Sequence, residues 1–527
     1  MIYEYQWPHT MDGVGKATYP NLPSSLPRML ELRVMSIPNH VAVITGKEQF
    51  TYQELWEHSG RAALYLQQMG VRAGDRVVLR LSNSWSFVVW LFGCMRAGIL
   101  VVPTNYRFSH TEFLPLSTLL DSTVTICETS DEHLMQLPGR LVDEHAYLTI
   151  EYSVPDVPVV SPNNPAILFL TSGTSGVPKA VPLSHENMLT SVETYRRVFS
   201  LHSSDSTLIM IPLFHVTGLI GQLLTILAAG GTAVLAKKFG EVSFLDLMRR
   251  HRITFFFGVP TIFIRVLNHM RTEGAVNFPD WRVAASGGAP IPAALFVALE
   301  NAFPRLQVFN TYGMTEVSSP ATILPESDAL WRPGSVGRPV PYAQLRVVDP
   351  DTGIDANPGE VGELWIRGPM VSQGYWHKSE RNLCFTNDGW IMSGDLTWVD
   401  DEGFVYVVDR LKDVINRGGE KIFPGEIENV LYQHPDILEA SVVGVPDEVW
   451  GENVAALVVP KLNRTIEPTN IQTWVSNYLS RYKVPKIVVV GSDIPKNQNG
   501  KVDKKAVKAL VRAAIEGNQV NAAGERR

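Results

Sequence analysis

The chain has 527 residues, 45% of them hydrophobic, with a formal net charge of −7 and a pI near 6.0. This length exceeds the usual size of one domain, and the acidic balance argues against general nucleic-acid binding. Three scattered cysteines predict neither a disulfide framework nor a metal site. Without a signal-like N-terminus or an unbroken apolar span, the sequence predicts a cytoplasmic protein with no integral membrane segment.

Alternating helix-like and strand-like patterns predict an α/β fold for most of the chain. Helices are expected at 52–69, 84–97, 185–199, 219–229 and 261–270, and strands at 75–81, 99–103, 166–169, 206–211, 232–236 and 254–257. This rhythm predicts mixed or parallel sheets covered by helices. Beyond these elements, short strands near 345–348 and 362–368, separated by Gly, Pro and Asp turns, predict a small barrel-like β subdomain.

A second domain is predicted after Arg410, where the chain becomes more charged. Helices are expected near 425–433 and 467–480, with strands at 441–445 and 454–459, which is typical of an α+β domain. We place the boundary at Lys412, so that the domains comprise residues 1–411 and 412–527. No function is predicted for residues 1–23.

The most informative segment is LTSGTSGVPK at residues 170–179, which follows an apolar run. Such a run indicates a buried strand that ends in a loop. Glycines let backbone amides approach an anion, hydroxyls donate to phosphate oxygens, and Lys179 adds a positive charge. The loop is not of the Walker type, because Pro178 precedes the lysine and Ala180 follows it. It is therefore a candidate phosphate loop, with an ordinary surface Ser/Gly loop as the alternative.

Four more motifs follow in order: YGMTE at 312–316, SGD at 393–395, DRLKD at 409–413 and NGK at 499–501. With the loop, this set resembles the adenylate-forming, AMP-binding enzymes, which include acyl- and aryl-CoA synthetases, luciferases and peptide-synthetase adenylation domains. The resemblance runs from about residue 25 to residue 508. It implies a large N-terminal AMP-binding domain, a mobile C-terminal domain, and attack of a carboxylate on the α-phosphate of ATP.

The resemblance implies nucleotide contacts at matching positions of this chain. The implied phosphate contacts are Thr171, Ser172, Gly173, Thr174 and Lys179. The implied adenine-site residues are Gly288, Ala289, Pro290, Asn310, Thr311 and Tyr312.

The same resemblance implies that Glu316 binds Mg²⁺, a hard cation that prefers oxygen ligands, and that Thr315 contacts the α-phosphate. Asp395 would accept from both ribose hydroxyls, and Arg410 would contact the ribose and phosphates. The alternative for Glu316 is a surface turn carboxylate, and for Arg410 it is a salt bridge with the neighbouring Asp409.

In the C-terminal part the resemblance assigns a catalytic lysine, Lys501, that bridges the carboxylate and the α-phosphate. Lys412 matches the hinge about which the family's C-terminal domain rotates. Gly418 and Gly419 would then leave room for the pantetheine arm of coenzyme A. A solvated lysine and a structural glycine turn are the alternatives.

The acyl site is predicted around His215, in the segment PLFHVTG at 212–218, which resembles the segment whose histidine gates this site. The candidate wall residues are Phe256, Phe257, Gly258, Val259, Ala285, Gly287 and Gly313. A core histidine is the alternative. Residues 213–218 and 255–261 contain no acidic or basic side chain, which favours a hydrophobic medium-chain or aromatic monocarboxylate over an amino acid or a dicarboxylate.

We therefore expect an AMP-forming acyl-CoA synthetase that uses ATP, Mg²⁺ and coenzyme A. Coenzyme A is favoured because no phosphopantetheine attachment motif is visible and the chain ends soon after Lys501. The nearest alternative is a stand-alone ligase that loads a separate acyl carrier protein. A binding-only homologue is disfavoured because Glu316, Asp395 and Lys501 are all present, and the motifs do not exclude luciferase-type oxidation.

Overall fold

The computed structural model describes residues 18–122, 124–128, 140–153, 155, 158, 160–171, 179–274, 276–289, 291–377, 384–496 and 502–524. They fall into two compact units. The first unit comprises Met1–Arg346, Trp365–Ser393 and Asp400–Val405, and the second comprises Val347–Leu364, Gly394–Val399 and Tyr406–Arg527. Within the described residues, no helix is both long and apolar enough to cross a membrane.

One sheet of the first unit has the strand order β6-β5-β3-β4-β7-β8. Its strands are β3 (Arg76–Arg80), β4 (Leu100–Pro103), β5 (Val124–Cys127), β6 (Arg140–Asp143), β7 (Pro165–Thr171) and β8 (Lys179–Ser184). All neighbours are parallel except β7 and β8, which are antiparallel. β4 and β5 are buried along their whole length, which explains why they read as continuous apolar runs in the sequence.

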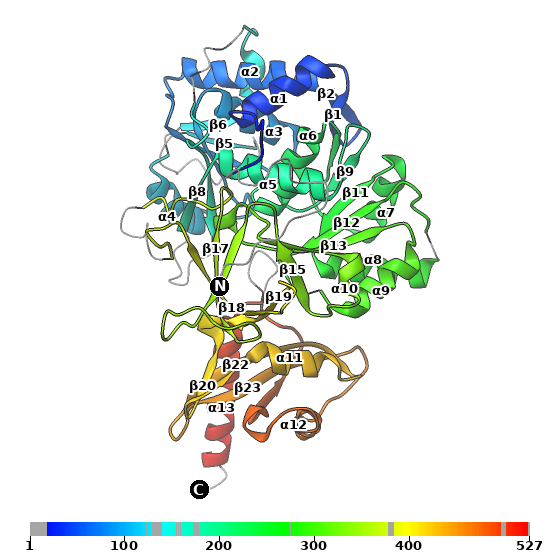
Figure 1. Ribbon diagram of the computed structural model, residues 1–527, viewed down its shortest axis with the longest axis vertical. Helices are drawn as coiled ribbons and strands as arrows, with labels where there is room; N and C mark the ends of the chain where they lie inside the picture. Colours follow the sequence, from blue (N-terminus) through cyan, green and yellow to red (C-terminus); the bar gives the residue numbers. More distant parts are fainter. Residues whose placement is uncertain are drawn as a thin grey trace. The chain divides into compact units, whose positions relative to one another are not determined.

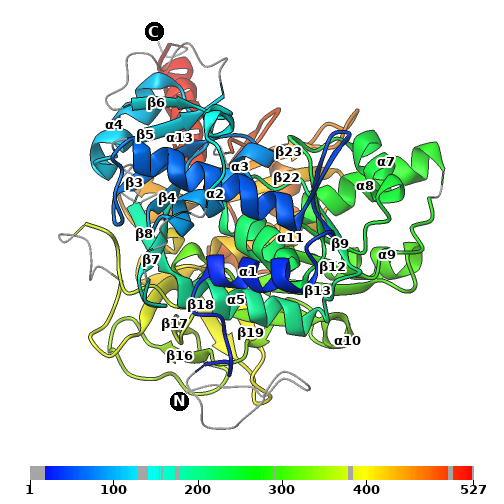
Figure 2. The same ribbon diagram turned by 90° about the horizontal axis from the view of Figure 1, so that it is seen from above.

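Helices α1 (Leu26–Ser36), α2 (Tyr52–Gln68) and α3 (Trp85–Arg96) pack against one another in the N-terminal part of the unit, as Figure 2 shows in blue. α2 starts at a capping box in which Thr51 and Glu54 satisfy each other's backbone amides. A Cβ at Gly93 of α3 would lie only 2.6 Å from the Cβ of Ala62 in α2. Small residues therefore allow α2 and α3 to approach closely.

The second large sheet carries nine strands of the first unit in the order β2-β1-β10-β9-β11-β12-β13-β14-β15 (Figure 1). Its strands are β1 (Val41–Thr45), β2 (Glu48–Thr51), β9 (Ser206–Ile209), β10 (Thr232–Leu235), β11 (Phe255–Gly258), β12 (Val283–Gly287), β13 (Gln307–Tyr312), β14 (Thr322–Pro325) and β15 (Ser335–Pro339). The six neighbouring strands β1, β10, β9, β11, β12 and β13 are parallel to one another. The outer strands β2, β14 and β15 are antiparallel to their neighbours. This confirms the predicted mixed α/β architecture.

The remaining elements of the first unit connect and cover these sheets. The helices are α4 (His110–Leu120), α5 (His185–Val198), α6 (Thr225–Ala229), α7 (Glu241–Arg250), α8 (Pro260–Glu273), α9 (Ala293–Ala302) and α10 (Glu326–Ala329), with short turns η2 (Ala146–Thr149) and η4 (Thr315–Val317) and the π-helix η3 (Thr217–Leu224). Four strands are each divided between the two units: β16 (Gln344–Val348), β17 (Gly362–Arg367), β18 (Ile391–Val399) and β19 (Val405–Arg410).

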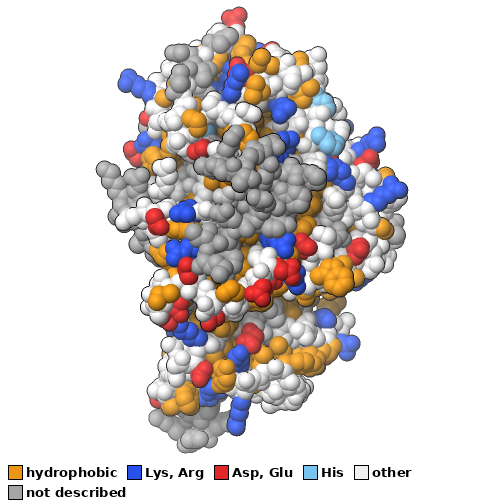
Figure 3. Space-filling view, viewed as in Figure 1, with side chains coloured by type: hydrophobic (Ala, Val, Ile, Leu, Met, Phe, Trp, Pro, Cys, Tyr) orange, Lys and Arg blue, Asp and Glu red, His pale blue; other side chains and the backbone are white. Residues whose placement is uncertain are grey.

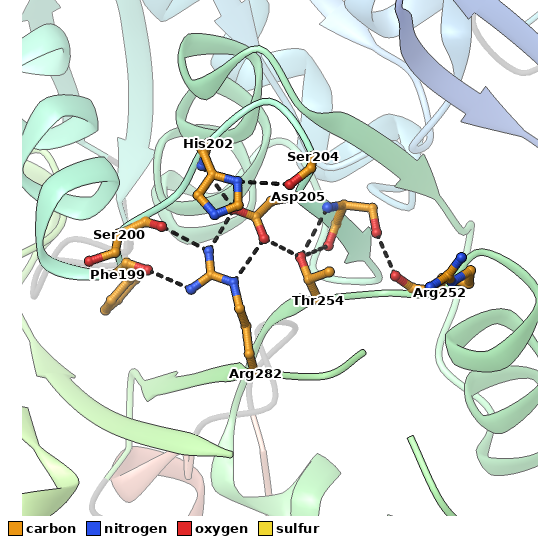
Figure 4. Close-up of polar contacts among 9 residues, drawn as sticks. Phe199, Ser200, His202, Ser204, Asp205, Arg252, Thr254 and Arg282 are labelled. Atoms are coloured by element: carbon orange, nitrogen blue, oxygen red, sulfur yellow. Dashed lines mark hydrogen bonds and ion pairs between the residues drawn. The ribbon is translucent and has the colours of Figure 1, made fainter. Parts of the chain in front are cut away.

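A polar cluster ties together the amino ends of the parallel strands β9, β11 and β12 (Figure 4). The guanidinium of Arg282 donates to both carboxylate oxygens of Asp205, at 2.9 and 2.6 Å, and to the carbonyls of Phe199 and Ser200. The Thr254 hydroxyl donates to Asp205 at 2.7 Å. These contacts lie at the amino ends of the strands. Open α/β sheets bind their ligands at the opposite, carboxyl ends.

The second unit is built on an α+β core. Its strands are β20 (Ile415–Arg417), β21 (Glu420–Ile422), β22 (Ile437–Asp447), β23 (Gly451–Pro460) and β24 (Ile487–Val490), and its helical elements are η5 (Leu411–Asp413), α11 (Pro424–Tyr432), α12 (Pro468–Ser476), η6 (Arg481–Lys483) and α13 (Lys504–Gly524). The strand order is β21-β20-β23-β22, with β24 pairing β23.

Alternate residues of β22 and β23 enter two hydrophobic clusters of the second unit. Val442 and Val458 pack with α11 and α12, whereas Val443 and Leu457 pack with α13. Figure 1 shows the two strands between α11 and α13. Because side chains alternate along each strand, each face of β22 and β23 packs on a different cluster, and both faces are therefore apolar. The predicted domain boundary at Lys412 stays a prediction.

Candidate active site

The candidate phosphate loop begins and ends on two paired strands. β7 and β8 place Thr171 opposite Lys179, and the Thr171 hydroxyl donates to the Lys179 carbonyl at 3.4 Å. The two ends of the loop are therefore held together at one point. Three of the predicted phosphate contacts lie outside the described residues: Ser172, Gly173 and Thr174.

Lys179 and the predicted metal ligand Glu316 share one partner, Tyr375, which sequence analysis did not single out. The Lys179 ammonium lies 4.8 Å from the centre of the Tyr375 ring, and the Tyr375 hydroxyl donates to Glu316 Oε1 at 2.9 Å. Burial, together with the charge of Glu316, raises the pKa of Tyr375 well above its ordinary value, so the hydroxyl is a donor at neutral pH. A basic and an acidic group are thus brought to one point of the first unit.

Glu316 is placed by a tight turn directly after β13. It lies in η4 and is followed by Ser318 and Ser319, whose φ angles are 56° and 99°. A Cβ at Gly313 would lie 1.5 Å from the carbonyl oxygen of Ser319, so only glycine fits there. The turn leaves Thr315 half-buried and Glu316 buried. Burial contradicts the alternative that Glu316 is an ordinary surface carboxylate.

Three of the predicted adenine-site residues, Asn310, Thr311 and Tyr312, are the last residues of β13. Because side chains alternate along a strand, Asn310 and Tyr312 share one face and Thr311 lies on the other. The Thr311 hydroxyl donates to the Ser286 carbonyl of the adjacent β12 at 3.1 Å. The strand therefore places Asn310 and Tyr312 on one face, where the buried Asn310 amide donates to the Ser335 carbonyl at 3.4 Å.

The other predicted adenine contacts follow the carboxyl end of β12. Gly288 and Ala289 are exposed, and Gly288 has a φ of 78°, a conformation that favours glycine. A Cβ at the preceding Gly287 would lie 2.5 Å from the Thr311 hydroxyl, so this position also needs glycine. Pro290 lies outside the described residues. The exposed backbone beside the carboxyl ends of β12 and β13 is where open α/β sheets bind ligands.

His215 lies half-buried in the segment between β9 and η3. Its ring centre is 4.4 Å from that of Phe214. The buried side chain of Asn83 holds this segment, because its Oδ1 accepts from Leu213 N at 2.9 Å and its Nδ2 donates to the Ile211 carbonyl at 3.0 Å. Asn83 thereby joins the loop before α3 to the predicted acyl site.

The helix predicted at 219–229 is present, but its first part is the π-helix η3, which begins at Thr217. Sequence patterns do not separate a π-helix from an α-helix, so this difference could not be foreseen. Two glycines of η3 lie close to neighbouring segments. A Cβ at Gly218 would lie 2.7 Å from the Pro212 carbonyl, and one at Gly221 would lie 3.1 Å from the Phe257 ring. π-helices are rare and are frequent at functional sites.

The candidate wall residues do not all face one side of the sheet. Phe257 lies toward η3 and α5, with its ring centre 5.8 Å from that of Tyr195. Phe256 lies on the other face, 5.0 Å from Phe244 and 5.7 Å from Phe263. The expectation that both phenylalanines line one pocket is therefore wrong, because neighbours in a strand point in opposite directions.

In the second unit, the predicted ribose residues contact each other. Arg410 Nε lies 2.6 Å from Asp395 Oδ1, and Asp395 is 4% exposed. The adjacent Asp409 instead accepts from the backbone amides of Arg410 and Gly425, both at 2.7 Å. The Arg410 guanidinium therefore pairs with Asp395, which contradicts the alternative of a salt bridge between Arg410 and Asp409. This arrangement holds a buried carboxylate beside a half-exposed cation.

Gly418 and Gly419 form the two-residue turn of the β20–β21 hairpin. Their φ angles are 62° and 93°, which only glycine adopts without strain and which match a type I′ turn. The turn packs on an exposed indole, since a Cβ at Gly418 would lie 2.6 Å from the Trp450 ring. The predicted hinge residue Lys412 lies exposed in η5, and the predicted catalytic Lys501 lies outside the described residues.

The residues present fit a magnesium ion that binds together with a nucleotide. Among the described residues, no group of three or more His, Cys, Asp or Glu side chains is placed to hold a metal by itself. Glu316 offers one hard oxygen donor, and Mg²⁺ commonly takes its remaining ligands from substrate phosphates and water. A single buried carboxylate near the phosphate loop has the chemistry such a shared site needs.

Sequence reasoning missed Tyr375 and Ser372, which lie in a segment without regular structure. The Ser372 amide donates to the Glu316 carbonyl at 2.8 Å, and its hydroxyl donates to the Pro182 carbonyl at 2.7 Å. The only local signal is an aromatic pair after Gly374 in a turn-rich stretch. That signal carries no chemistry until the fold brings Glu316 to it.

Comparison with known proteins places these residues in a family. The model of the AMP-binding enzyme matches residues 30–376, and that of the AMP-binding enzyme C-terminal domain matches residues 426–501. A feruloyl-CoA synthase from Amycolatopsis sp is 34% identical over 487 residues, which cover 90% of this chain and 97% of the relative. An oxalate–CoA ligase from Arabidopsis thaliana is 33% identical over 508 residues, which cover 92% and 98%.

A solved structure is similar over nearly its whole length. The o-succinylbenzoate CoA synthetase from Bacillus subtilis, in complex with its acyl-adenylate intermediate, has a TM-score of 0.83 and 29% identity, and the match covers 91% of this chain and 97% of that one. The same synthetase has been solved with ATP and a magnesium ion. From its motifs, its fold and these matches, the chain belongs to the AMP-binding enzyme family.

Proposed function

We propose that this protein is an AMP-forming acid–CoA ligase that activates a hydrophobic monocarboxylate, aromatic or of medium chain length. One observation carries the proposal: Tyr375 brings the phosphate-loop lysine and the buried Glu316 to the same point of the first unit. A lysine with a carboxylate is what a triphosphate with its metal ion requires. Family membership supports the same reaction.

A carboxylate is a poor acyl donor, so it is first joined to the α-phosphate of ATP with release of pyrophosphate. Lys179 would offset phosphate charge, and Mg²⁺ held by Glu316 would supply further charge compensation. Asp395 would accept from the ribose hydroxyls, with Arg410 beside it. Lys501 would bridge the incoming carboxylate and the α-phosphate in the transition state. The acyl group is then transferred to the thiol of coenzyme A with release of AMP.

The apolar surroundings of the predicted acyl site support a hydrophobic acid. Phe257 is buried, the glycines at 221 and 287 lie against it, and His215 and Thr217 are the polar side chains of the adjoining segment. A second carboxylate would need a cationic partner there. The relatives include a synthetase named for a feruloyl group, which has one carboxylate, and ligases named for succinylbenzoate and oxalate, which have two.

Coenzyme A is the proposed acceptor because the compared relatives are named as CoA ligases or synthetases. Transfer to a separate acyl carrier protein is an outcome that the experiment below distinguishes.

On the face that Figure 3 shows, basic and acidic side chains are interspersed. The expected cytoplasmic location rests on the sequence alone and stays a prediction.

The test is carboxylate-dependent ATP–pyrophosphate exchange over fatty acids of increasing length, benzoates, cinnamates, arylacetates, dicarboxylates and amino acids. We expect exchange with one hydrophobic class, and release of AMP and thioester when coenzyme A is added. Glu316→Gln is the matched control, because it keeps the shape of the side chain and removes the charge. Exchange without thioester from coenzyme A would indicate a carrier protein as acceptor. No exchange with any acid, while ATP still binds, would contradict the proposal.

A further inference from the structure

The Tyr375 side chain contacts two charged groups at once, and the Cys384 thiol also lies against its hydroxyl. Its hydroxyl donates to Glu316 Oε1 at 2.9 Å, and its ring lies 4.8 Å below the Lys179 ammonium. Its ring edge also packs on Phe385 at 5.7 Å, and only 6% of the residue is exposed. The side chain is therefore held in one orientation while it contacts both charged groups.

The backbone around Tyr375 is tied to the same two elements. The Trp376 amide donates to the Ala180 carbonyl at 2.9 Å, next to Lys179 in β8. On the other side, the Ser372 amide donates to the Glu316 carbonyl at 2.8 Å. Three segments that are far apart in the sequence, β8, η4 and residues 370–376, are thus joined by hydrogen bonds. Tyr375 lies where the three segments meet.

We propose that Tyr375 is a positioning residue that orients Glu316 toward the metal ion and Lys179 toward the phosphates, so that metal and nucleotide bind together. This inference rests on the proposed function and adds a residue to it. A donor on one carboxylate oxygen of Glu316 fixes the orientation of the carboxylate toward a metal. A π-face holds the ammonium without neutralising it, so its charge remains available for phosphate.

The test separates the hydroxyl from the ring. Tyr375→Phe removes only the donor, and Tyr375→Leu removes the aromatic face as well. Tyr52→Phe is the matched control, because Tyr52 is also buried and its hydroxyl donates to the Gly231 carbonyl at 2.7 Å, in another part of the first unit. Each variant is made in the full chain, and its thermal unfolding midpoint is recorded.

The readouts are calorimetric affinity for ATP in the presence of EDTA, and the affinity of the enzyme–ATP complex for Mn²⁺ measured by electron paramagnetic resonance. In Tyr375→Phe we expect metal affinity to fall roughly tenfold, the loss of one hydrogen bond to a charged acceptor, while ATP affinity without metal is unchanged. Tyr375→Leu should weaken ATP binding without metal as well, about threefold or more. Tyr52→Phe should change neither affinity, whatever its effect on the unfolding midpoint.

Unchanged Mn²⁺ affinity in Tyr375→Phe would overturn the inference, and so would an equal loss in Tyr52→Phe, since that would indicate a general effect of a lost buried hydroxyl. If Tyr375→Leu does not fold, the Phe variant alone still decides. Wild-type protein that binds ATP and Mn²⁺ and catalyses exchange, with Tyr375→Phe indistinguishable from it, would contradict only this inference. Wild-type protein that binds neither would contradict the proposed function as well.

Discussion

Asp205 is a carboxylate with 1% of its side chain exposed, and it keeps its charge through its neighbours. Burial raises its pKa, but the hydrogen bonds from Arg282, the His202 amide and the Thr254 hydroxyl outweigh burial and leave the pKa below its ordinary value. This residue therefore contributes to folding as an anion, and its partners Thr254 and Arg282 directly precede the strands β11 and β12 of one sheet. It lies at the opposite ends of these strands from the predicted adenine-site residues.

We expect Asp205→Asn to lower the free energy of unfolding by about 2–3 kcal/mol at pH 7, because hydrogen bonds to a charged acceptor are lost. Since the folded-state pKa is lowered, the stabilisation is present above the unfolded-state pKa and is lost as pH falls through the folded-state value. The difference between wild type and variant should therefore shrink below about pH 4.

Urea denaturation at pH 7 and pH 3.5 would measure both effects. Asp280→Asn is the matched control, because Asp280 pairs with the exposed Arg252 at 2.9 Å and an exposed pair contributes less than about 1 kcal/mol. Equal losses in the two variants, or a constant difference across pH, would contradict this account of Asp205.

A second prediction at this scale concerns Lys501. If it bridges the carboxylate and the α-phosphate, Lys501→Ala should lower pyrophosphate exchange by about 100-fold or more and leave thioester formation from supplied acyl-adenylate largely intact. Lys496→Ala is the control, because its ammonium pairs with Glu439 at 2.7 Å. Rapid-quench assays of each half-reaction would show the split, and equal loss of both steps would contradict the assignment.

At the scale of elements, the two ends of the parallel strands in the first unit differ in what they carry. The amino ends of β9, β11 and β12 are joined by the Arg282 cluster. The carboxyl ends of β12 and β13 carry exposed glycine and the residues before Glu316. Such a division lets loops at one edge vary without loss of the core.

The β20–β21 hairpin gives a prediction for an element of the second unit. Gly418→Ala and Gly419→Ala should each cost about 1–2 kcal/mol from the left-handed backbone conformation. Gly418→Ala should cost more, because its Cβ would meet the Trp450 ring at 2.6 Å, whereas nothing lies within 4 Å of a Cβ at Gly419. Thermal unfolding of both variants, and of Gly418→Ala with Trp450→Ala, would test this.

The added Trp450→Ala should recover the difference between the two glycine variants, since it removes the ring and not the backbone strain. A larger loss in Gly419→Ala would mean that the indole can move aside. If the hairpin contributes to the second half-reaction, both variants should also slow thioester formation more than adenylate formation.

At the scale of the whole molecule, two units carry different parts of the predicted chemistry. Lys179, Tyr375 and Glu316 belong to the first unit, whereas Asp395 and Arg410 belong to the second. The family resemblance implies that a domain rotates about Lys412 between the half-reactions. This rotation stays a prediction.

Lys412→Pro tests this rotation, because proline restricts the backbone angles of one residue in the short η5 turn. We expect adenylation within about threefold of wild type and thioester formation lowered by at least tenfold. Lys421→Pro would be a poor control, since it lies in a strand, so Lys412→Ala serves instead and should resemble wild type. Unchanged turnover in Lys412→Pro would contradict the hinge.

Much of this molecule was predictable because burial leaves a local pattern. β4 is an apolar run because a parallel strand is covered on both faces. The capping pair Thr51 and Glu54 marks the start of α2 in the sequence. Phe256 was placed on the wrong side because its strand is apolar on both faces, so apolar character did not reveal its direction. The π-helix at Thr217 was not predicted because its composition equals that of an α-helix.

The sequence by itself determined the fold class, the order of the motifs and the chemical character of each, because those depend on residue type and short-range spacing. Only the tertiary structure decided which charges meet: Tyr375 contacts Glu316 across 59 positions of sequence, and Arg410 pairs with Asp395 and not with its neighbour Asp409. Such partners are chosen by the packing of strands and turns that are remote along the chain. Local patterns record that a residue is buried, but not the residue against which it is buried.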